Sequence, residues 1–326
     1  MKYIYTSVFS AEMPQYLNLL REEGRYIPRI QSSLRSLDKY LANCGFAEKT
    51  LDAETITSWL KTREVGAVTK ANDIYRVKGF TKYLMSLGIK TSCPEVPKTQ
   101  SDYVPYLFSD AEFERIFSVA DNFEAVKFLT RSAYIFPVLL RVLYGCGLRL
   151  GEGQSLQWKN VDLENGVLTI REAKNLKQRF VPMDESLTAL IRAYRTMTQS
   201  DGICDDYLFE CHCNPGEPYR IRSFYVWFTK VIKAAGIIYA KHNSRERGPC
   251  THCLRHCFTL KSFLRSESEG RRFEDTAPVL AAYLGHDGPE GTETYLTSNH
   301  LVYTQSHQRV GAAIGHLFPE VRFDEE

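Results

Sequence analysis

Residues 147–152, with the sequence GLRLGE, form the junction that decides the fold of this chain. They overlap the end of a mostly apolar segment at residues 133–150, which predicts a buried helix. Gly147 marks the end of that helix, and Arg149 and Glu152 stand at the start of the next one. The stretch therefore predicts an arginine held where one helix ends and another begins.

Short strands are predicted downstream of this junction. The segments 161–163 and 167–170 flank a turn, and a third segment at 179–182 follows a basic turn. Turns this short join neighbouring strands in antiparallel order. Beyond residue 183 the pattern is helical again, so the predicted fold class is mostly α with a small antiparallel β-sheet.

An amphipathic pattern upstream of the junction predicts a helical bundle over residues 10–90. One stripe places Ile30, Leu34, Leu37 and Leu41 at spacings of three and four residues. This spacing puts the four side chains on one face of a helix. Further stripes with short connections between them are typical of a small bundle.

A polar, proline-containing segment separates this bundle from the rest of the chain. It has little to bury and cannot continue a helix, so we expect a linker. Ser109 and Glu112 follow it in a capping-box pattern, which predicts a helix start. The expected organisation is a helical domain at residues 1–92, a linker at 93–104 and a mixed α/β domain at 105–326 with a tail helix at 307–318.

Composition and charge are those of an ordinary globular protein. Of the 326 residues, 44% are hydrophobic and 25% are charged, which excludes a largely disordered chain and favours two domains. The net charge is +2, but residues 1–100 carry 15 basic and 10 acidic residues. A basic first domain hints at a nucleic-acid partner.

The start of the chain and its cysteines indicate a compartment. No signal-like apolar core precedes Glu12, and no run approaches the roughly 18 apolar residues that a membrane-spanning helix needs. Nine cysteines are an odd number, which fits free thiols in a reducing environment. We therefore expect a cytoplasmic protein, nucleoid-associated in a bacterial host.

Nucleotide and metal sites are the first alternatives for the chemistry. The dinucleotide fingerprint needs a glycine where the chain has Leu150, and no Gly-Lys-Ser/Thr follows a glycine-rich loop. His252 and His256 have the spacing of zinc-protease helices, but the glutamate that those helices need is absent. Arg255 between them would repel a metal ion. No cofactor or metal is expected, and buried free thiols are the favoured interpretation of the cysteines.

A set of charged and polar groups along the second domain carries stronger implications. No member is informative alone, because Arg149 could pair locally with Glu152 and His256 could be a core histidine. Together the groups combine two arginines, a lysine, two histidines and a tyrosine in a fixed order. The members are Arg149, Glu152, Lys174, His252, Arg255, His286 and Tyr295.

This ordered set resembles the signature of the tyrosine recombinase (phage integrase) superfamily. The resemblance covers essentially the whole chain: residues from Tyr106 to about Tyr303 match box by box, and the first hundred match in size, helicity and position. It implies a core-binding, SAM-like helical domain followed by a catalytic domain. It also implies an enzyme that cleaves and rejoins DNA through a covalent 3′-phosphotyrosine, without ATP, for integration, excision or transposition of a mobile element.

Phosphate chemistry suggests roles for the arginines and the tyrosine. The guanidinium groups of Arg149 and Arg255 can bind the non-bridging oxygens with forked hydrogen bonds and stabilise the growing charge. Tyr295 is the expected nucleophile, with Tyr283 and Tyr303 as nearby rivals. Its free pKa near ~10 means that it needs a nearby cation or base to lose its proton.

The remaining members of the set have supporting roles in this interpretation. Lys174 is expected to protonate the departing 5′-hydroxyl, and Lys177 is its rival. His252 is a base or a hydrogen-bond donor to the phosphate, and His286 holds the phosphate or the leaving oxygen. Glu152 is expected to orient the cationic groups.

The chain departs from the family pattern near the first arginine. Gly151 and Gly153 stand where the family usually has a serine and a helix-forming residue. Each glycine costs roughly 1 kcal/mol in a helix interior, so we expect a loose helix start.

Double-stranded DNA with paired recognition sites is the implied partner. The two domains would close around the duplex as a clamp, with affinity dominated by phosphate contacts. The resemblance also implies a homotetramer on two sites, with each C-terminal tail docked on a neighbour in trans; packing in cis stays open. The candidate DNA contacts are Lys177, Arg179, Lys241, Arg245 and Arg247.

Other classes of function stay open at this point. A type IB topoisomerase would use the same chemistry to relax DNA, and a regulator with a decayed site would bind DNA without cutting it. The presence of all seven groups argues against the regulator, and a zinc-dependent hydrolase is weaker still. The sequence does not choose among integration, excision, transposition and dimer resolution.

Overall fold

The computed structural model divides the chain into two compact units. These are Met1–Asp102 and Tyr103–Glu326, and their boundary falls inside the segment 93–104 that the sequence marks as a linker. The residues that the structure describes are 3–98, 105–125, 131–171, 178–198, 206–240 and 248–286.

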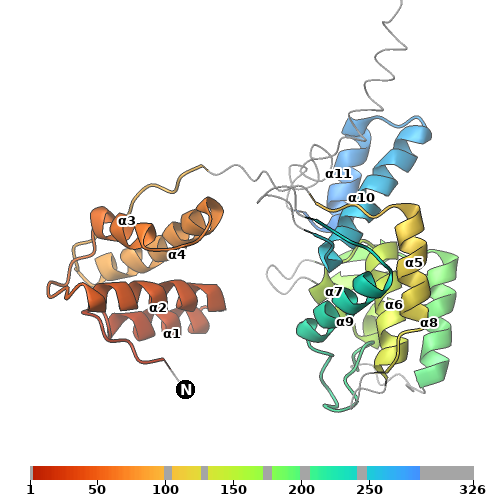
Figure 1. Cartoon of the computed structure of the whole chain (residues 1–326), viewed down its shortest axis with the longest axis horizontal. Coiled ribbons are helices and arrows are strands. Elements are labelled where there is room, and N and C mark those ends of the chain that lie inside the picture. Colours follow the sequence, from red (N-terminus) through yellow and green to blue (C-terminus); the bar gives the residue numbers. More distant parts are fainter. Residues whose placement is uncertain are drawn as a thin grey trace, which may run out of the picture. The chain divides into compact units, whose positions relative to one another are not determined.

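The first unit is a bundle of helices (Figure 1). Its helices are α1 (Glu12–Glu22), α2 (Pro28–Asn43), α3 (Ala53–Lys61) and α4 (Ala67–Ser86). On α2, Leu34, Leu37 and Leu41 are at most 1% exposed, while α2 packs against α3 and α4. Because this stripe is the one that the spacing predicts, the helical bundle expected for this region is confirmed.

A buried carboxylate joins three elements of the first unit. Asp73 on α4 is 1% exposed and accepts a hydrogen bond from the Ser33 hydroxyl on α2 at 2.6 Å. Its oxygens also pair with the guanidinium groups of Arg76 at 3.0 Å and Arg63 at 3.3 Å. A buried carboxylate needs such partners to offset the loss of water. Asp73 therefore ties α4 to α2 and to the segment after α3.

The second unit is built around one buried helix. Its helices are α5 (Asp110–Asp121), α6 (Ser132–Gly145), α7 (Leu150–Gln154), α8 (Glu185–Thr198), α9 (Ile221–Ala234), α10 (Thr251–Ser268) and α11 (Phe273–Leu284). α6 packs against α5, α7, α8 and α10, and it is the buried helix that the apolar segment predicts. Across the described residues, no helix has both the length and the apolar character needed to cross a membrane.

The first helix of this unit begins at the predicted capping box. The Ser109 hydroxyl accepts a hydrogen bond from the Glu112 backbone N–H at 3.3 Å, and the Glu112 carboxylate accepts one from the Ser109 N–H at 2.8 Å. These two bonds satisfy backbone donors that a helix start leaves without partners. The sequence prediction at this position is confirmed.

A small antiparallel sheet follows α7, as predicted. Its strands are β1 (Val161–Asp162), β2 (Val167–Arg171) and β3 (Gln178–Pro182), and they lie in the order β1-β2-β3. Leu168 pairs with Val181, and both side chains are fully buried. Side chains alternate between the faces of a strand, so Arg179 lies on the same face of β3 as Val181. This register turns one arginine toward the interior of the unit.

The junction between α6 and α7 depends on two glycines. Gly147 has φ +58°, and a Cβ there would lie 2.4 Å from Cδ1 of Phe258 on α10. Gly153 on α7 would place a Cβ 2.8 Å from Cδ2 of Leu143 on α6. The absence of side chains therefore allows α7 and α10 to approach this end of α6. The loose start expected for α7 stays a prediction, because the structure shows only that the lack of a side chain at Gly153 permits close packing against α6.

Candidate active site

Arg255 is fixed by the ends of two helices. It lies on α10, is completely buried, and donates from Nη1 to the Gly147 carbonyl at 2.9 Å and from Nη2 to the Leu284 carbonyl at 2.7 Å. The Gly147 carbonyl follows the end of α6, and the Leu284 carbonyl belongs to the last residue of α11. Backbone acceptors at these positions lack helical partners, and the helix dipole is negative there. The two helix ends therefore hold this guanidinium in a defined plane.

His286 directly follows the second of these helix ends. Gly285 has φ +69°, and the N–H of His286 closes the helix on the Ala281 carbonyl at 2.9 Å. The His286 Nε2 atom lies 3.0 Å from Nη2 of Arg255. An arginine can donate but not accept, so Nε2 is the acceptor and carries no proton. The imidazole is therefore neutral in this arrangement.

The pKa of His286 agrees with that assignment. Burial first, and then the positive charges of Arg255, Arg149 and Arg179, together lower the pKa of His286 to about 4. The same arginines therefore surround the imidazole and keep it uncharged at neutral pH.

Arg149 precedes the first turn of α7 and is the exposed member of the cluster. Its side chain is 40% exposed, and its Nη1 atom pairs with Oε1 of Glu152 at 2.8 Å. Its Nη2 atom reaches the Gly285 carbonyl at 3.4 Å. The end of α11 therefore contacts Arg149 as well as Arg255, which brings both guanidinium groups to His286.

Glu152 is the carboxylate around which these cations gather. Its oxygens accept from the Arg149 backbone N–H at 2.9 Å and from Nη2 of Arg179 at 2.8 Å, and Oε2 lies 3.8 Å from Nη1 of Arg255. Burial raises the pKa of this carboxyl, but the hydrogen bond and charge of Arg179, followed by those of Arg149, hold it below its ordinary value. Glu152 is therefore ionised at neutral pH and orients the arginines.

Arg179 belongs to this cluster, a position that the sequence does not predict. It is among the candidate DNA contacts, yet its side chain is 11% exposed and its Nε atom donates to the Tyr283 carbonyl at 2.9 Å. Its Nη2 atom also donates to Glu152 at 2.8 Å, so Arg179 links β3, α7 and α11. The signal in the sequence is a basic residue at an inward-facing position of a strand whose next residue, Phe180, is exposed.

Two histidines on α10 complete the described part of the site. The rings of His252 and His256 meet edge to face with their centroids 4.7 Å apart. Although part of the His252 ring is exposed, desolvation by the surrounding protein and the charges of Arg255 and Arg149 together lower its pKa to about 4. Burial lowers the pKa of His256 to about 3, so both rings are neutral near pH 7.

Several residues selected from the sequence lie outside the described residues. The structure brings together Arg149, Glu152, His252, Arg255 and His286 as the ordered set predicts. The rival Tyr283 is half-buried on α11, where its ring stacks on Phe258 and burial raises its pKa. The selected residues outside the described ranges are Lys174, Lys177, Lys241, Arg245, Arg247, Tyr295, Tyr303 and the tail at 307–318.

The cysteines and histidines do not gather as a metal site in the part of the chain that the structure describes. No group of three or more His, Cys, Asp or Glu side chains there has the arrangement of metal ligands. His212 instead contacts the Tyr219 hydroxyl through Nδ1 at 3.0 Å and the Cys213 sulfur through Nε2 at 3.4 Å.

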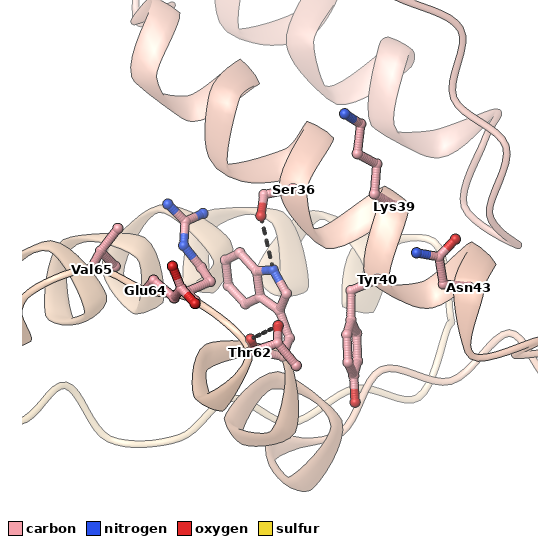
Figure 2. Close-up of a pocket in the computed structure, with 9 residues that line it drawn as sticks. Ser36, Lys39, Tyr40, Asn43, Thr62, Glu64 and Val65 are labelled. Carbon is pink, nitrogen blue, oxygen red and sulfur yellow. Dashed lines mark hydrogen bonds between the residues drawn. The ribbon is translucent and has the colours of Figure 1, made fainter.

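The first unit contains an open pocket of about 450 Å³ (Figure 2). Trp59 forms part of its wall and donates from Nε1 to the Ser36 hydroxyl at 3.2 Å. The Arg63 guanidinium covers the Trp59 ring at 5.4 Å, whereas the exposed Lys39 extends from α2 at the rim. The pocket is lined by Ser36, Lys39, Tyr40, Asn43, Trp59, Thr62, Arg63, Glu64 and Val65.

Comparison with known families shows which family this chain matches. The model of the phage integrase family matches residues 108–301, which contain every member of the ordered set. The chain belongs to this family of tyrosine recombinases. Its members are enzymes that cleave and rejoin DNA strands.

Two relatives of this recombinase are identical to it at a quarter of the aligned residues or slightly more. A putative integrase/recombinase from Sinorhizobium fredii is 28% identical over 72% of the chain and 75% of its own length. The tyrosine recombinase XerA of Pyrococcus horikoshii is 25% identical over 88% of the chain and 82% of its own length. Among solved structures, a lambda integrase dimer bound to a core site covers 87% of the chain and 94% of its own, with a TM-score of 0.62 and 13% identity. This last likeness shows the fold alone.

Proposed function

We propose that this recombinase is site-specific and works through a covalent 3′-phosphotyrosine on Tyr295. The observation that carries the proposal is the convergence of Arg149 and Arg255 on His286, with Glu152 orienting both guanidinium groups. A phosphodiester bound there meets two forked donors for its non-bridging oxygens. Such pre-oriented donors stabilise the charge that develops when an oxygen attacks phosphorus.

The neutral histidines act beside these arginines. His252 takes the proton of the attacking hydroxyl or donates a hydrogen bond to the phosphate, and His286 holds a phosphate or leaving oxygen. The function of a base needs an imidazole that is uncharged at working pH, which the lowered pKa of His252 supports, and a neutral His286 can still donate one ring N–H to an oxygen. Lys174 protonates the departing 5′-hydroxyl, with Lys177 as its rival.

Tyr295 is the proposed nucleophile. Its oxygen bonds to phosphorus and the 5′-oxygen leaves with a proton, so the energy of the phosphodiester is kept in the new bond. A 5′-hydroxyl from a second strand then attacks the phosphotyrosine and restores the tyrosine, which gives strand exchange without ATP. Tyr283 fits this role poorly because it is packed against Phe258 and its pKa is raised by burial.

Arg179 is a positioning residue in this proposal. It pairs with Glu152 at 2.8 Å and with the Tyr283 carbonyl at 2.9 Å, so it joins the carboxylate to the last turn of α11. Its side chain is largely buried, which favours an indirect role over contact with DNA.

Double-stranded DNA with paired recognition sites is the proposed substrate. The lambda integrase structure is described as a dimer bound to a core site, which supports a DNA partner and an oligomer. In the first unit, Lys39 at the rim of the pocket is placed to contact a backbone phosphate, whereas Arg63 is held by Asp73. The further proposed contacts, outside the described residues, are Lys177, Lys241, Arg245 and Arg247.

Four protomers on two DNA sites form the proposed assembly, with each tail at 307–318 docked on its neighbour. Deleting residues 307–326 should then keep single-site binding and remove the slower two-site complex in a gel shift. Normal synapsis by the truncated protein would show that the tail packs in cis. The proposed biological role is integration, excision or transposition of a mobile element.

Trapping the covalent intermediate tests the proposed mechanism. A nicked substrate that contains the recognition site loses a short fragment after cleavage, so rejoining is prevented and the adduct accumulates. The wild-type chain should give a protein–DNA adduct on a denaturing gel in the presence of EDTA, and Tyr295→Phe should bind DNA but give none. An adduct with Tyr295→Phe would reject Tyr295, and a wild-type chain that binds the site but never forms one would support a regulator. Relaxation of supercoiled DNA without strand exchange would favour a topoisomerase.

A further inference from the structure

Two cysteines flank His252 at the start of α10. Cys250 is the residue before the first turn, with extended backbone (φ −146°, ψ 167°), and Cys253 lies in that turn. Their sulfur atoms are 3.5 Å apart. Neither residue belongs to the proposed chemistry of DNA cleavage, so the pair calls for a separate explanation.

The geometry of this pair is close to that of a disulfide. A disulfide bond is ~2.05 Å long, so rotation about the Cys250 and Cys253 side chains closes most of the gap. A Cys-X-X-Cys sequence at a helix N-terminus is also a reactive arrangement, because the positive end of the helix dipole stabilises a thiolate. The pair therefore combines the spacing and the field that thiol oxidation needs.

The two thiols differ in ways that define an order of reaction. Cys250 is half-buried and accessible, whereas Cys253 is completely buried. The hydrogen bond to Cys250 raises the pKa of the Cys253 thiol, and burial raises it further. Cys253 therefore stays a protonated, buried thiol, and the accessible Cys250 sulfur is the one that meets an oxidant first.

We propose that Cys250 and Cys253 form a redox modification site that takes peroxides and closes to an intramolecular disulfide. The Cys250 thiolate attacks a peroxide oxygen, the O–O bond breaks, and a sulfenic acid and one water form. The Cys253 sulfur then displaces the sulfenic oxygen as a second water and leaves the disulfide. Two thiols lose two electrons in total, and hydrogen peroxide is reduced to two waters.

Closure of this disulfide changes the position of His252. Arg255 is anchored to the Gly147 and Leu284 carbonyls, so the body of α10 stays in place and the movement falls on residues 250–253. His252 lies between the two cysteines in the sequence, and its ring packs on the His256 ring with the centroids 4.7 Å apart. If DNA cleavage uses His252 as proposed above, oxidation should lower its rate by about 10²-fold, the lower range for loss of a general acid or base.

Other cysteines in the described residues provide controls. Cys257 lies one turn further along α10, but it is buried and accepts a hydrogen bond from the Phe108 N–H at 3.3 Å. Cys44 is exposed in the first unit. A thiol that is merely accessible should therefore behave like Cys44, whereas Cys250 and Cys253 should both be consumed as one disulfide.

Peptide mapping of the whole chain tests the modification directly. Trypsin should release residues 248–255, GPCTHCLR, with both cysteines in one peptide. After treatment with hydrogen peroxide and alkylation, we expect this peptide without alkyl groups and two hydrogens lighter than its thiol form. Dithiothreitol added before alkylation should restore two alkylation sites. Free thiols in this peptide at a peroxide dose that oxidises Cys44 would overturn the proposal.

The adduct assay tests the consequence for function. Oxidised wild-type protein should form adduct about 10²-fold more slowly and recover with dithiothreitol. Cys250→Ser should stay active after peroxide because it cannot form the disulfide, and serine is a residue favoured before a helix, so the start of α10 is kept. Cys44→Ser should remain as sensitive to peroxide as the wild type. Circular dichroism checks that each variant is folded. Cys253→Ala is a second variant that cannot form the disulfide. If the disulfide is mapped but the rate of adduct formation is unchanged, the proposed effect on His252 is wrong. If neither the reduced nor the oxidised protein forms an adduct, the proposed function is rejected, whereas the result of the peptide mapping stays valid.

Discussion

Asp73 in the first unit and Glu152 in the second are both buried carboxylates that pair with arginines, yet they serve different ends. Arg63 and Arg76, the partners of Asp73, have side chains about one-fifth exposed, and Arg63 is also packed over Trp59. Glu152 pairs with Arg149, whose side chain is 40% exposed and reaches the end of α11. The comparison teaches that pairing alone does not mark a phosphate site. The cluster around Glu152 differs from that around Asp73 because it combines a partly exposed guanidinium with neutral imidazoles and helix-end carbonyls.

Removing Arg149 should cause the largest effect on catalysis. Arg149→Ala should slow adduct formation by about 10²–10³-fold, the usual effect of removing one donor to a developing charge. Rates come from single-turnover cleavage with excess protein. Arg265→Ala is the matched control, because it removes an arginine that is 83% exposed on α10. An equal loss in both variants would mean that Arg149 acts through net charge alone.

Removing Asp73 should instead affect stability. Asp73→Ala leaves two partly buried guanidinium groups without their carboxylate, which should lower the free energy of unfolding by about 3–5 kcal/mol. Urea unfolding measures this change, and Arg149→Ala serves as the comparison, with a change below about 1 kcal/mol expected for a partly exposed pair. Similar losses in the two variants would erase the distinction between the two clusters.

Acid should lower the stability of the cluster around Glu152 in two successive pH windows. His286 has a folded pKa of about 4 against an ordinary value of 6.5, so the unfolded chain takes up a proton first and stability falls as pH drops from 6.5 to 4. Glu152 has a folded pKa below its ordinary 4.5, so its contribution is present above 4.5 and is lost as pH falls through the folded value. Urea unfolding of His286→Gln should show a smaller loss of stability in the first window, to which His252 and His256 also contribute, and Glu152→Gln should show a smaller loss in the second. An unchanged profile in either variant would contradict the assignment for that residue.

The smallest effect is expected at the rim of the pocket in the first unit. Lys39→Ala should weaken DNA binding by less than about tenfold and reduce the salt slope of log K by about 1, the change for one lost phosphate contact. Fluorescence anisotropy at several salt concentrations measures both quantities. Lys70→Ala, an intermediate-exposure lysine on α4, tests whether any lysine of this unit gives the same result. Equal slopes for the wild type and Lys39→Ala would remove Lys39 from the DNA surface.

Local patterns in the sequence predict the elements that depend on neighbouring residues. The stripe on α2, the capping box at Ser109 and the pairing of β2 with β3 all follow from spacing over a few residues. The ordered set also predicts that Arg149, Arg255 and His286 meet, because the family resemblance supplies contacts that spacing cannot. The predictions for α2, Ser109 and the sheet are confirmed by the described structure. The structure also places Arg255 beside His286 and Arg149 beside the Gly285 carbonyl, whereas the catalytic roles of these groups stay predictions.

The features that the sequence does not predict depend on contacts between distant elements. Arg179 enters the cluster because β3 lies against α11, an approach that a local pattern does not encode. Gly153 is explained by the side chain of Leu143 on another helix, although its propensity alone predicts a loose turn. The Cys250 and Cys253 sulfurs are a local exception. The sequence places these residues three apart at the start of α10, but the distance of 3.5 Å between the sulfurs also depends on their side-chain rotamers.

The central claim is that the cluster around Glu152 stabilises the negative charge of a phosphodiester during cleavage. Its most direct test compares the wild type with Arg149→Ala on two DNA substrates, one with a normal phosphate at the cleavage site and one with an uncharged methylphosphonate. The wild type should exceed Arg149→Ala by about 10²–10³-fold on the phosphate, and the two should differ little on the methylphosphonate, which lacks the charge that the guanidinium balances. The same ratio on both substrates would contradict the claim.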